Sequence, residues 1–252
     1  MRNEAFPKRL FNAIGDRWRE KSREAGTLAA ALEVGSALWG FLRDSTPERR
    51  RRRYGDMEFD WEHRVDTTSG TVGWRERLLG VFLSPYQPTD PAEFREMMDR
   101  LPCDFREFTF IDLGSGKGRT LLMASGYPFR RIIGVEIVPE LHRAAEENIR
   151  NYQSPTQRCR QIESICADAR EFSLPEEPVL LYLFNPLPEI ALREVLTRLE
   201  TGPARSPRSL WIAYYNPQLE TVLAAFPWLE KISERPNTAI YRTKNDAGNA
   251  LQ

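Results

Sequence analysis

Cysteine and histidine are both scarce in this chain. Its 252 residues include three cysteines, Cys103, Cys159 and Cys166, which have no paired spacing, and two histidines. A disulfide framework and a clustered metal site need several such ligands at short spacing, so neither is expected. An odd number of unpaired thiols is typical of a reducing compartment, and we expect a cytoplasmic protein.

The chain also lacks an excess of charge of either sign and a long apolar run. Thirty-six basic residues balance thirty-six acidic ones, so no overall field favours a nucleic-acid partner or an anionic membrane. The longest apolar stretch, 27–42, contains Glu33 and is too short to cross a bilayer. Residues 1–9 are not followed by the apolar run of a secretory signal. We expect no membrane span.

Changes of pattern along the chain predict four segments. Residues 1–53 are helical and charge-rich and end in five consecutive arginines, from Arg49, which repel one another and favour a solvated linker. An anionic ligand for this run is the alternative. Residues 54–104 contain irregular sequence and are a candidate lid or substrate segment. Residues 105–245 form the expected catalytic core, and 246–252 form a tail.

From residue 108 onward, short apolar runs alternate with amphipathic stretches, which is typical of βαβ units and a parallel sheet. The expected strands are 108–113, 131–136, 161–166, 179–184 and 210–215. The expected helices are 120–125, 139–152, 189–199 and 218–225, after an earlier one that begins near Pro91. A last pair of strands, 228–233 and 238–242, forms a hairpin around Pro236-Asn237. The fold class is therefore α/β, a Rossmann-like doubly wound sheet with an N-terminal helical extension.

The loop after the first expected strand carries the strongest functional signal. It reads Asp112-Leu113-Gly114-Ser115-Gly116-Lys117-Gly118 and leads into a helix. In open α/β sheets, ligands bind beyond the carboxyl ends of the strands, and glycine lets the backbone approach a ligand closely. An ordinary tight turn is the alternative, but three glycines at alternate positions are costly without such a reason.

Two cofactor classes compete for this loop. A dinucleotide fingerprint needs a glycine where this chain has Arg119, so a nicotinamide oxidoreductase is disfavoured. The Asp-x-Gly-x-Gly-x-Gly pattern resembles the first motif of class I S-adenosylmethionine-dependent methyltransferases. In that family the loop borders the methionine part of the cofactor, and the leading acid, here Asp112, helps to hold its ammonium group. The resemblance covers 108–242 and implies a seven-stranded, mostly parallel sheet whose last strand is antiparallel.

Two further acids follow the next strands. Glu136 lies 22 residues after Gly114, where its carboxylate can accept hydrogen bonds from two ribose hydroxyls; a surface acid is the alternative. The resemblance implies that Asp168 meets the adenine amino group; a helix N-cap is the alternative. The predicted contacts of S-adenosyl-L-methionine are therefore Asp112, Gly114, Ser115, Gly116, Gly118, Glu136 and Asp168.

The fourth and fifth strands both end in Asn-Pro, at 185–186 and 216–217. Asn185-Pro186 resembles the start of the Asn-Pro-Pro-aromatic motif of amino-group methyltransferases, in which the amide oxygen accepts a hydrogen bond from the target nitrogen. Leu187 and Pro188 depart from that motif, which puts nucleic-acid-base and glutamine substrates in doubt. The alternative is that the asparagines cap the helices that follow them.

Three residues before the core complete the predicted catalytic set. His63 and Asp66 are candidate proton acceptors, with a structural or surface role as the alternative for each, and Tyr86 lies in the same candidate lid. Together with 112–119 and 185–186, this segment resembles a bacterial group of class I methyltransferases without a known substrate. A remoter similarity to protein-lysine methyltransferases with this sheet implies an amine acceptor on a protein or a small molecule. The second hypothesis is a non-catalytic S-adenosylmethionine-binding protein that docks a partner through its N-terminal helices.

Overall fold

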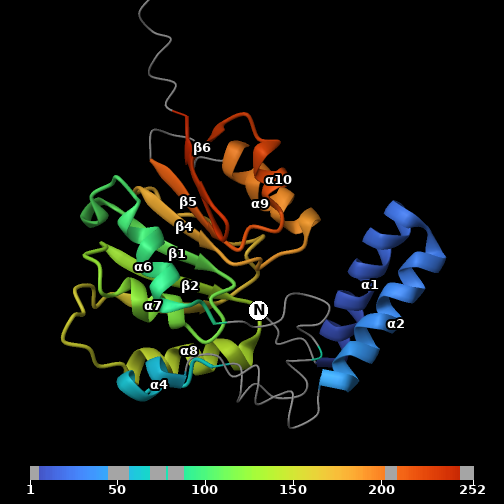
Figure 1. The fold of residues 1–252 in the computed structure, drawn as a ribbon, viewed down its shortest axis with the longest axis horizontal. Helices are drawn as coiled ribbons and strands as arrows, with labels where there is room; N and C mark the ends of the chain where they lie inside the picture. The colour runs from blue at the N-terminus through green and yellow to red at the C-terminus, as the bar shows by residue number, and fades with distance from the viewer. Residues whose placement is uncertain (1–5, 45–56, 69–77, 79–87, 202–208, 245–252) are drawn as a thin grey trace, which may run out of the picture.

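Seven strands form one sheet in the computed structural model, which describes residues 6–44, 57–68, 78, 88–201 and 209–244 (Figure 1). The strands follow the order β3-β2-β1-β4-β5-β7-β6. They are β1 (Thr109–Leu113), β2 (Arg131–Glu136), β3 (Ile162–Cys166), β4 (Val179–Leu183), β5 (Leu210–Tyr215), β6 (Leu229–Arg235) and β7 (Thr238–Thr243). Neighbours are parallel except that β7 runs antiparallel to both β5 and β6. The implied sheet, with its antiparallel last strand, is confirmed.

The central strands are buried along their whole length because helices cover both faces of the sheet. Every residue of β1 and β4 is buried. Strands that are buried on both faces read as continuous apolar runs rather than alternating ones. The doubly wound arrangement expected from the sequence is therefore confirmed.

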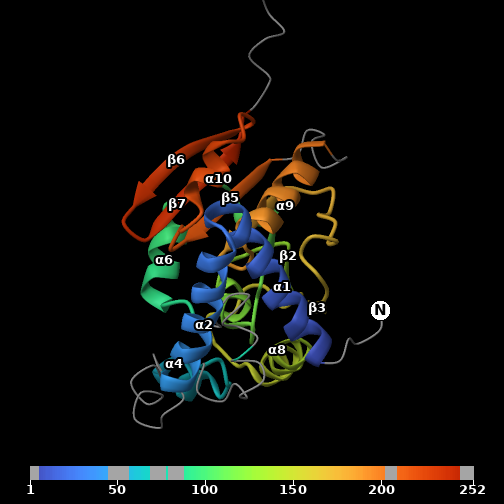
Figure 2. The ribbon, with the colours of Figure 1, turned by 90° about the vertical axis from the view of Figure 1, so that its right-hand side faces the viewer.

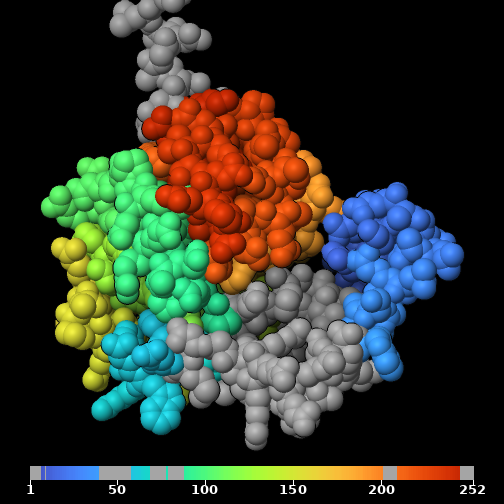
Figure 3. All heavy atoms as spheres, viewed as in Figure 1, coloured from blue at the N-terminus to red at the C-terminus, as the bar shows by residue number. Residues whose placement is uncertain are grey.

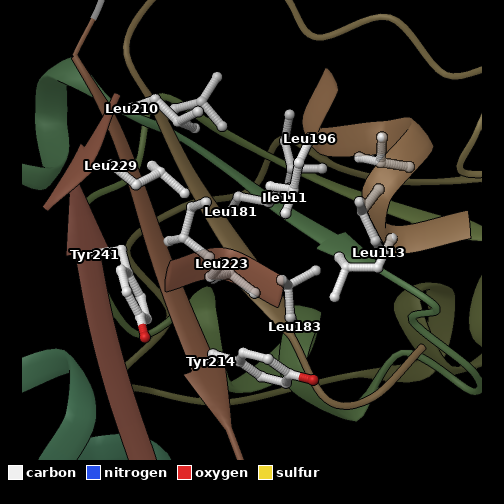
Figure 4. Close-up of a cluster of buried hydrophobic side chains, with 14 of the residues drawn as sticks. Ile111, Leu113, Leu181, Leu183, Leu196, Leu210, Tyr214, Leu223, Leu229 and Tyr241 are labelled. Carbon is white, nitrogen blue, oxygen red and sulfur yellow. The ribbon is translucent and has the colours of Figure 1, made fainter. Parts of the chain in front are cut away.

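The helices of the core form two layers. They are α6 (Pro91–Asp99), α7 (Arg119–Ala124), α8 (Pro139–Asn151), α9 (Glu189–Thr201) and α10 (Glu220–Ala224). On one face, Leu196 of α9 and Leu223 of α10 pack against alternate strand residues such as Ile111 and Leu181 (Figure 4). On the other face, helices α6 and α7 pack against the intervening strand residues, among them Phe110.

The N-terminal segment forms a pair of helices beside the sheet. Helices α1 (Phe6–Ala25) and α2 (Thr27–Asp44) pack on each other and project from the side of the molecule (Figures 2 and 3). Ala13 of α1 is buried with Val138 and Leu141, which follow the carboxyl end of β2. The pair therefore attaches next to the strand end that carries Glu136. Among the described helices, none has the length and apolar character needed to cross a membrane.

Several element boundaries differ from the expectation by one or two residues. Helix α10 begins at Glu220 rather than 218, because Leu219 has a φ of −110° and a ψ of 37°, outside the helical region. Strand β6 extends to Arg235 and contains an irregularity between Lys231 and Ser233. The turn between β6 and β7 lies at Pro236-Asn237, as predicted.

Candidate functional site

The glycine loop needs its glycines for backbone reasons. Gly114, Gly116 and Gly118 have φ values of 78°, 54° and 82°, in the left-handed region that favours glycine. The N–H groups of Gly114 and Ser115 both donate to the carbonyl of Val135, at 2.8 and 3.1 Å. The loop therefore folds over the end of β2 before α7 begins.

Close packing adds a second requirement at two of these glycines. A Cβ atom at Gly114 would lie 2.5 Å from the Cβ of Pro186, and one at Gly118 would lie 3.2 Å from the Cβ of Ala145 in α8. Ordinary van der Waals contact begins at about 3.5 Å, so Gly114 is too tight for a side chain, whereas at Gly118 the neighbour would have to shift by a few tenths of an ångström. The structure thereby brings the glycine loop and the Asn-Pro pair after β4 into direct contact.

Another glycine, Gly134 in β2, leaves space for the side chain of Ser115 in the loop. A Cβ at Gly134 would lie 2.6 Å from the hydroxyl oxygen of Ser115. That hydroxyl is buried and has no hydrogen-bond partner in the described part of the chain. A buried hydroxyl without a partner is uncommon in proteins and calls for an explanation.

Asp112 is a buried acid at the start of the loop. Its side chain is 3% exposed, and the hydroxyl of Thr120 donates to its carboxylate. Burial raises the pKa of Asp112 from its ordinary value of 3.8 to about 7; the Thr120 hydrogen bond opposes this shift, and the nearby charge of Glu136 adds to it. The site thus contains a carboxylate whose charged form is destabilised.

Glu136 is also buried, so a simple surface role is excluded. It is 5% exposed, and its two carboxylate oxygens accept hydrogen bonds from the N–H groups of Gly116 at 2.8 Å and Val138 at 2.7 Å. These bonds fix the carboxylate against the glycine loop. Each carboxylate oxygen has a second lone pair in addition to the one used here.

Asp168 lies beyond the end of β3, in a turn rather than at the start of a helix. It accepts hydrogen bonds from the backbone N–H of Arg170 at 2.9 Å and from the Arg170 guanidinium. Burial raises the pKa of Asp168, but the hydrogen bonds and charge of Arg170 outweigh it, so the pKa is lowered overall. Because β3, β2 and β1 are adjacent, the three acids lie at the carboxyl ends of neighbouring strands. They are Asp112, Glu136 and Asp168.

Asn185 bridges the ends of β4 and β5. Its amide nitrogen donates to the carbonyl of Asn216 at 2.7 Å, while its amide oxygen accepts from the hydroxyl of Tyr214 at 2.7 Å and from the N–H of Gln218 at 3.3 Å. Asn185 and Asn216 have φ values of 45° and 47°. The amide of Asn185 therefore reaches across to the segment before α10 rather than capping its own following helix, α9.

The three candidate residues before the core fall in different places. His63 ends α4 (Met57–His63), and its ring packs between those of Phe59 and Tyr152, next to the C-terminal end of α8. The structure does not bring it together with the Asn-Pro pairs. Asp66 does meet the loop, because its carboxylate accepts a hydrogen bond from the Lys117 ammonium at 2.9 Å. Tyr86 lies outside the described residues.

Sequence reasoning missed a second set of residues around the loop. Lys117 and Arg119 are 3% and 2% exposed, although charged residues are rarely fully buried without partners. Asn148, in α8, is likewise 3% exposed and bonds to both the loop and residue 66. The available sequence signal for these buried contacts was a charged residue within the glycine loop, Lys117, and another directly after it, Arg119. Among the described residues, no group of three or more His, Cys, Asp or Glu side chains is arranged to hold a metal.

Comparison with known proteins finds similarity only among solved structures, since no family model and no curated protein matches. An RNA methyltransferase from Salinibacter ruber in complex with S-adenosyl-L-homocysteine has 22% identity and a TM-score of 0.41, over 62% of this chain and 92% of that chain. A ribosomal protein L11 methylase from Lactobacillus delbrueckii subsp. bulgaricus has 13% identity and a TM-score of 0.41, over 61% and 76%. The N-methyltransferase NodS from Bradyrhizobium japonicum has 14% identity and a TM-score of 0.44, over 62% and 98%.

The sheet of this chain carries the fold assignment. Its seven strands, with β7 antiparallel and the glycine loop after β1, agree with what the first motif implied. The chain therefore has the fold of the class I S-adenosylmethionine-dependent methyltransferases.

Proposed function

We propose that this chain binds S-adenosylmethionine at the loop 112–118 and transfers its methyl group to an acceptor. The observation that carries the proposal is the pair of buried carboxylates, Asp112 and Glu136, beside a buried Ser115 hydroxyl that has no partner among the described residues. Two carboxylates in one buried site repel each other and favour a ligand with positive charge and hydrogen-bond donors. S-adenosylmethionine has a sulfonium, an ammonium and a ribose diol.

Each residue of this set has a separate role in the proposal. Asp112 pairs with the ammonium group, and that cation stabilises the charged carboxylate that burial destabilises. Glu136 accepts hydrogen bonds from the ribose hydroxyls while the N–H groups of Gly116 and Val138 hold it in place. Asp168, held in place by Arg170, accepts a hydrogen bond from the adenine amino group.

The geometry of Arg119 supports this cofactor over a dinucleotide. A dinucleotide loop needs glycine at this position so that the helix can pack closely on the sheet. Here Arg119 is 2% exposed, donates to Thr67 at 2.7 Å and lies 5.1 Å from the ring centre of Phe59. The Arg119 side chain therefore fills the space that a dinucleotide loop leaves to glycine, and it bonds to the segment that contains Thr67.

Bound S-adenosylmethionine supplies an electrophilic methyl group, so that an acceptor lone pair forms the new bond as the carbon–sulfur bond breaks and S-adenosylhomocysteine leaves. Such a displacement needs the acceptor held in line at short distance and free of its proton. The residues that position the acceptor should therefore lie beside the glycine loop. Two of the predicted catalytic residues meet this loop: Pro186 packs against Gly114, and Asp66 accepts a hydrogen bond from Lys117.

We propose an amine of a protein or a small molecule as the acceptor, with Asn185-Pro186 orienting the nitrogen. The Asn185 amide already bonds to Tyr214 and Asn216, so a target nitrogen must meet its backbone carbonyl or replace one of these contacts. A hollow lies beside Asn216, the residue to which Asn185 donates, at the same edge of the sheet. It is lined by Asn216, Pro217, Glu220, Glu234, Arg235 and Pro236.

A second candidate is a protein that binds S-adenosylmethionine without turnover and docks a partner through α1 and α2. Large apolar side chains on this helix pair favour it. Their exposed fractions are 77% for Phe11, 75% for Leu28, 67% for Leu32 and 68% for Trp39. Exposed apolar patches of this kind are typical of protein contacts.

Two measurements separate these functions. Calorimetry with S-adenosylhomocysteine and with NAD tests the cofactor; binding of NAD alone would overturn the proposal. Incubation with methyl-labelled S-adenosylmethionine and an extract from a strain lacking this protein then tests turnover. Label in the protein or small-molecule fraction supports an amine acceptor, whereas label confined to nucleic acid contradicts it. Cofactor binding without transfer to any fraction favours the non-catalytic candidate.

A further inference from the structure

The segment Met57–Thr68 is attached to the glycine loop through one buried amide. The N–H of Asp66 donates to the Asn148 side-chain oxygen at 2.8 Å. The Asn148 side-chain nitrogen donates to the carbonyl of Asp66 at 2.8 Å and to that of Lys117 at 2.9 Å. Asn148 therefore pairs with both backbone groups of residue 66 and, at the same time, with the backbone of the loop.

The side chain of Lys117 makes a second connection between the same two segments. Its ammonium group donates to the carboxylate of Asp66 and to the carbonyl of Thr68, both at 2.9 Å. The Lys117 side chain is 4% exposed and that of Asp66 is 51% exposed, so the ion pair joins a buried ammonium group to a half-exposed carboxylate. Hydrogen bonds that involve a charged group are about twice as strong as neutral ones.

Arg119 and Asp60 complete the attachment. The carboxylate of Asp60 accepts the N–H groups of Thr67 at 2.7 Å and Thr68 at 2.9 Å. Arg119 contacts the same carboxylate at 3.3 Å and the Thr67 hydroxyl at 2.7 Å. The N–H group of Asp66 is thus engaged by Asn148 in α8, whereas those of Thr67 and Thr68 are engaged by Asp60 within the segment itself.

Among the side chains described in this segment, most of the buried ones are polar. Asp60, Thr67 and Thr68 are buried polar residues, beside the buried ring of Phe59. Polar groups are costly to bury unless every bond forms, and these bonds need the loop backbone at Lys117 in its present conformation. Docking of the segment and the conformation of the loop therefore depend on each other.

We propose that Asn148 and Lys117 are positioning residues that couple the docking of segment 57–68 to the ligand-binding conformation of the glycine loop. The inference rests on the proposed function, because it assigns the loop to S-adenosylmethionine. Coupling between two sites is reciprocal. A ligand bound to the loop must therefore strengthen the docking of the segment. Loosening the segment must weaken the binding of the ligand by the same factor.

Hydrogen exchange with and without S-adenosylhomocysteine tests the coupling on the full-length protein. In the wild type, the ligand should slow amide exchange in peptides that contain residues 66 to 68. Asn148→Ala should speed exchange there and weaken the binding of S-adenosylhomocysteine about tenfold. Asn151→Ala, at an exposed position of the same helix, should change neither quantity. A merely structural Asn148 would lower the melting temperature while leaving the affinity per folded molecule unchanged.

A second pair of variants keeps the inference testable if Asn148→Ala does not fold. Lys117→Met and Asp66→Asn remove opposite ends of one ion pair. Each should weaken the binding of S-adenosylhomocysteine severalfold, and the double variant should bind it no more weakly than the weaker-binding single variant. Fully additive losses, or no ligand protection at 66 to 68, would overturn the inference. A wild type that binds no S-adenosylhomocysteine would instead refute the proposed function.

Discussion

Gly114 and Pro186 join two strand ends so closely that a Cβ on the glycine would lie 2.5 Å from the proline Cβ. The Gly114→Ala variant would also place alanine at a φ of 78°. The strain and the overlap should together cost about 2 to 4 kcal/mol. For a domain of this size, a melting temperature lower by roughly 5 to 15 °C follows, together with weaker cofactor binding.

Gly126→Ala is the matched control for this substitution. Its Cβ would lie 3.4 Å from the nearest atom, the carbonyl oxygen of Met123, at the limit of ordinary contact. A small change is expected there. If Gly114→Ala melted like the wild type and kept its affinity for S-adenosylhomocysteine, the contact between the loop and the Asn-Pro pair would have no part in the site.

The raised pKa of Asp112 makes the stability of the ligand-free protein depend on pH. Because its pKa of about 7 lies above the ordinary 3.8, its contribution to stability is fully present below about pH 4 and is lost as pH rises to about 7. The loss amounts to about 4 kcal/mol at most. Urea unfolding between pH 5 and 8 should show wild-type stability falling with pH, with a flatter profile for Asp112→Asn. Parallel profiles would contradict the raised pKa.

Cofactor binding should also release a proton near neutral pH. An ammonium group beside Asp112 favours its charged form, so part of the population must lose a proton when the ligand binds. Calorimetry at pH 7 in two buffers of different ionisation enthalpy measures this release. Equal apparent enthalpies in both buffers, with normal affinity, would mean that the ammonium group binds elsewhere.

Glu136→Gln tests the ribose contact. The substitution keeps the side-chain volume but removes the charge of the carboxylate that accepts a hydrogen bond from the N–H of Gly116 and that we propose accepts hydrogen bonds from the ribose. Binding of S-adenosylhomocysteine should weaken by about 1.5 to 3 kcal/mol, the usual contribution of a hydrogen bond to a charged group. Glu163→Gln, at an exposed position of β3, is the control. Equal dissociation constants for the two variants would remove Glu136 from the cofactor site.

Asn185→Ala separates a catalytic role from a structural one. Loss of the bonds to Tyr214, Asn216 and Gln218 should cost about 1 to 3 kcal/mol of stability. If Asn185 also orients the acceptor, turnover per folded molecule should fall about 100-fold with little change in cofactor affinity. The measurement is a pair, melting temperature and turnover on the acceptor identified by labelling. A melting shift with normal turnover would leave Asn185 a structural residue and remove the main reason for an amine acceptor.

The sequence by itself determined the sheet and the position of the glycine loop. Apolar runs such as Arg131–Glu136 and the three glycines act within a few residues, so their effect on strand ends and backbone conformation is readable locally. The alternation of strands and helices then placed Asp112, Glu136 and Asp168 at the carboxyl ends of their strands. The predicted helix 218–225 begins two residues later in the structure, where the backbone of Leu219 lies outside the helical region.

Only the tertiary structure decided which side chains meet across the site. Asn148 bonds to residue 66, which is 82 positions away, and Asn185 bonds to Asn216, 31 positions away. An asparagine amide has the same hydrogen-bonding groups on any surface, so nothing in the local pattern names its partner. For the same reason, the sequence left both a base and a structural or surface residue open for His63, and only the fold placed its ring against Tyr152. Burial selects one set of polar partners because unpaired polar groups are costly there, and burial is a property of the whole packed chain.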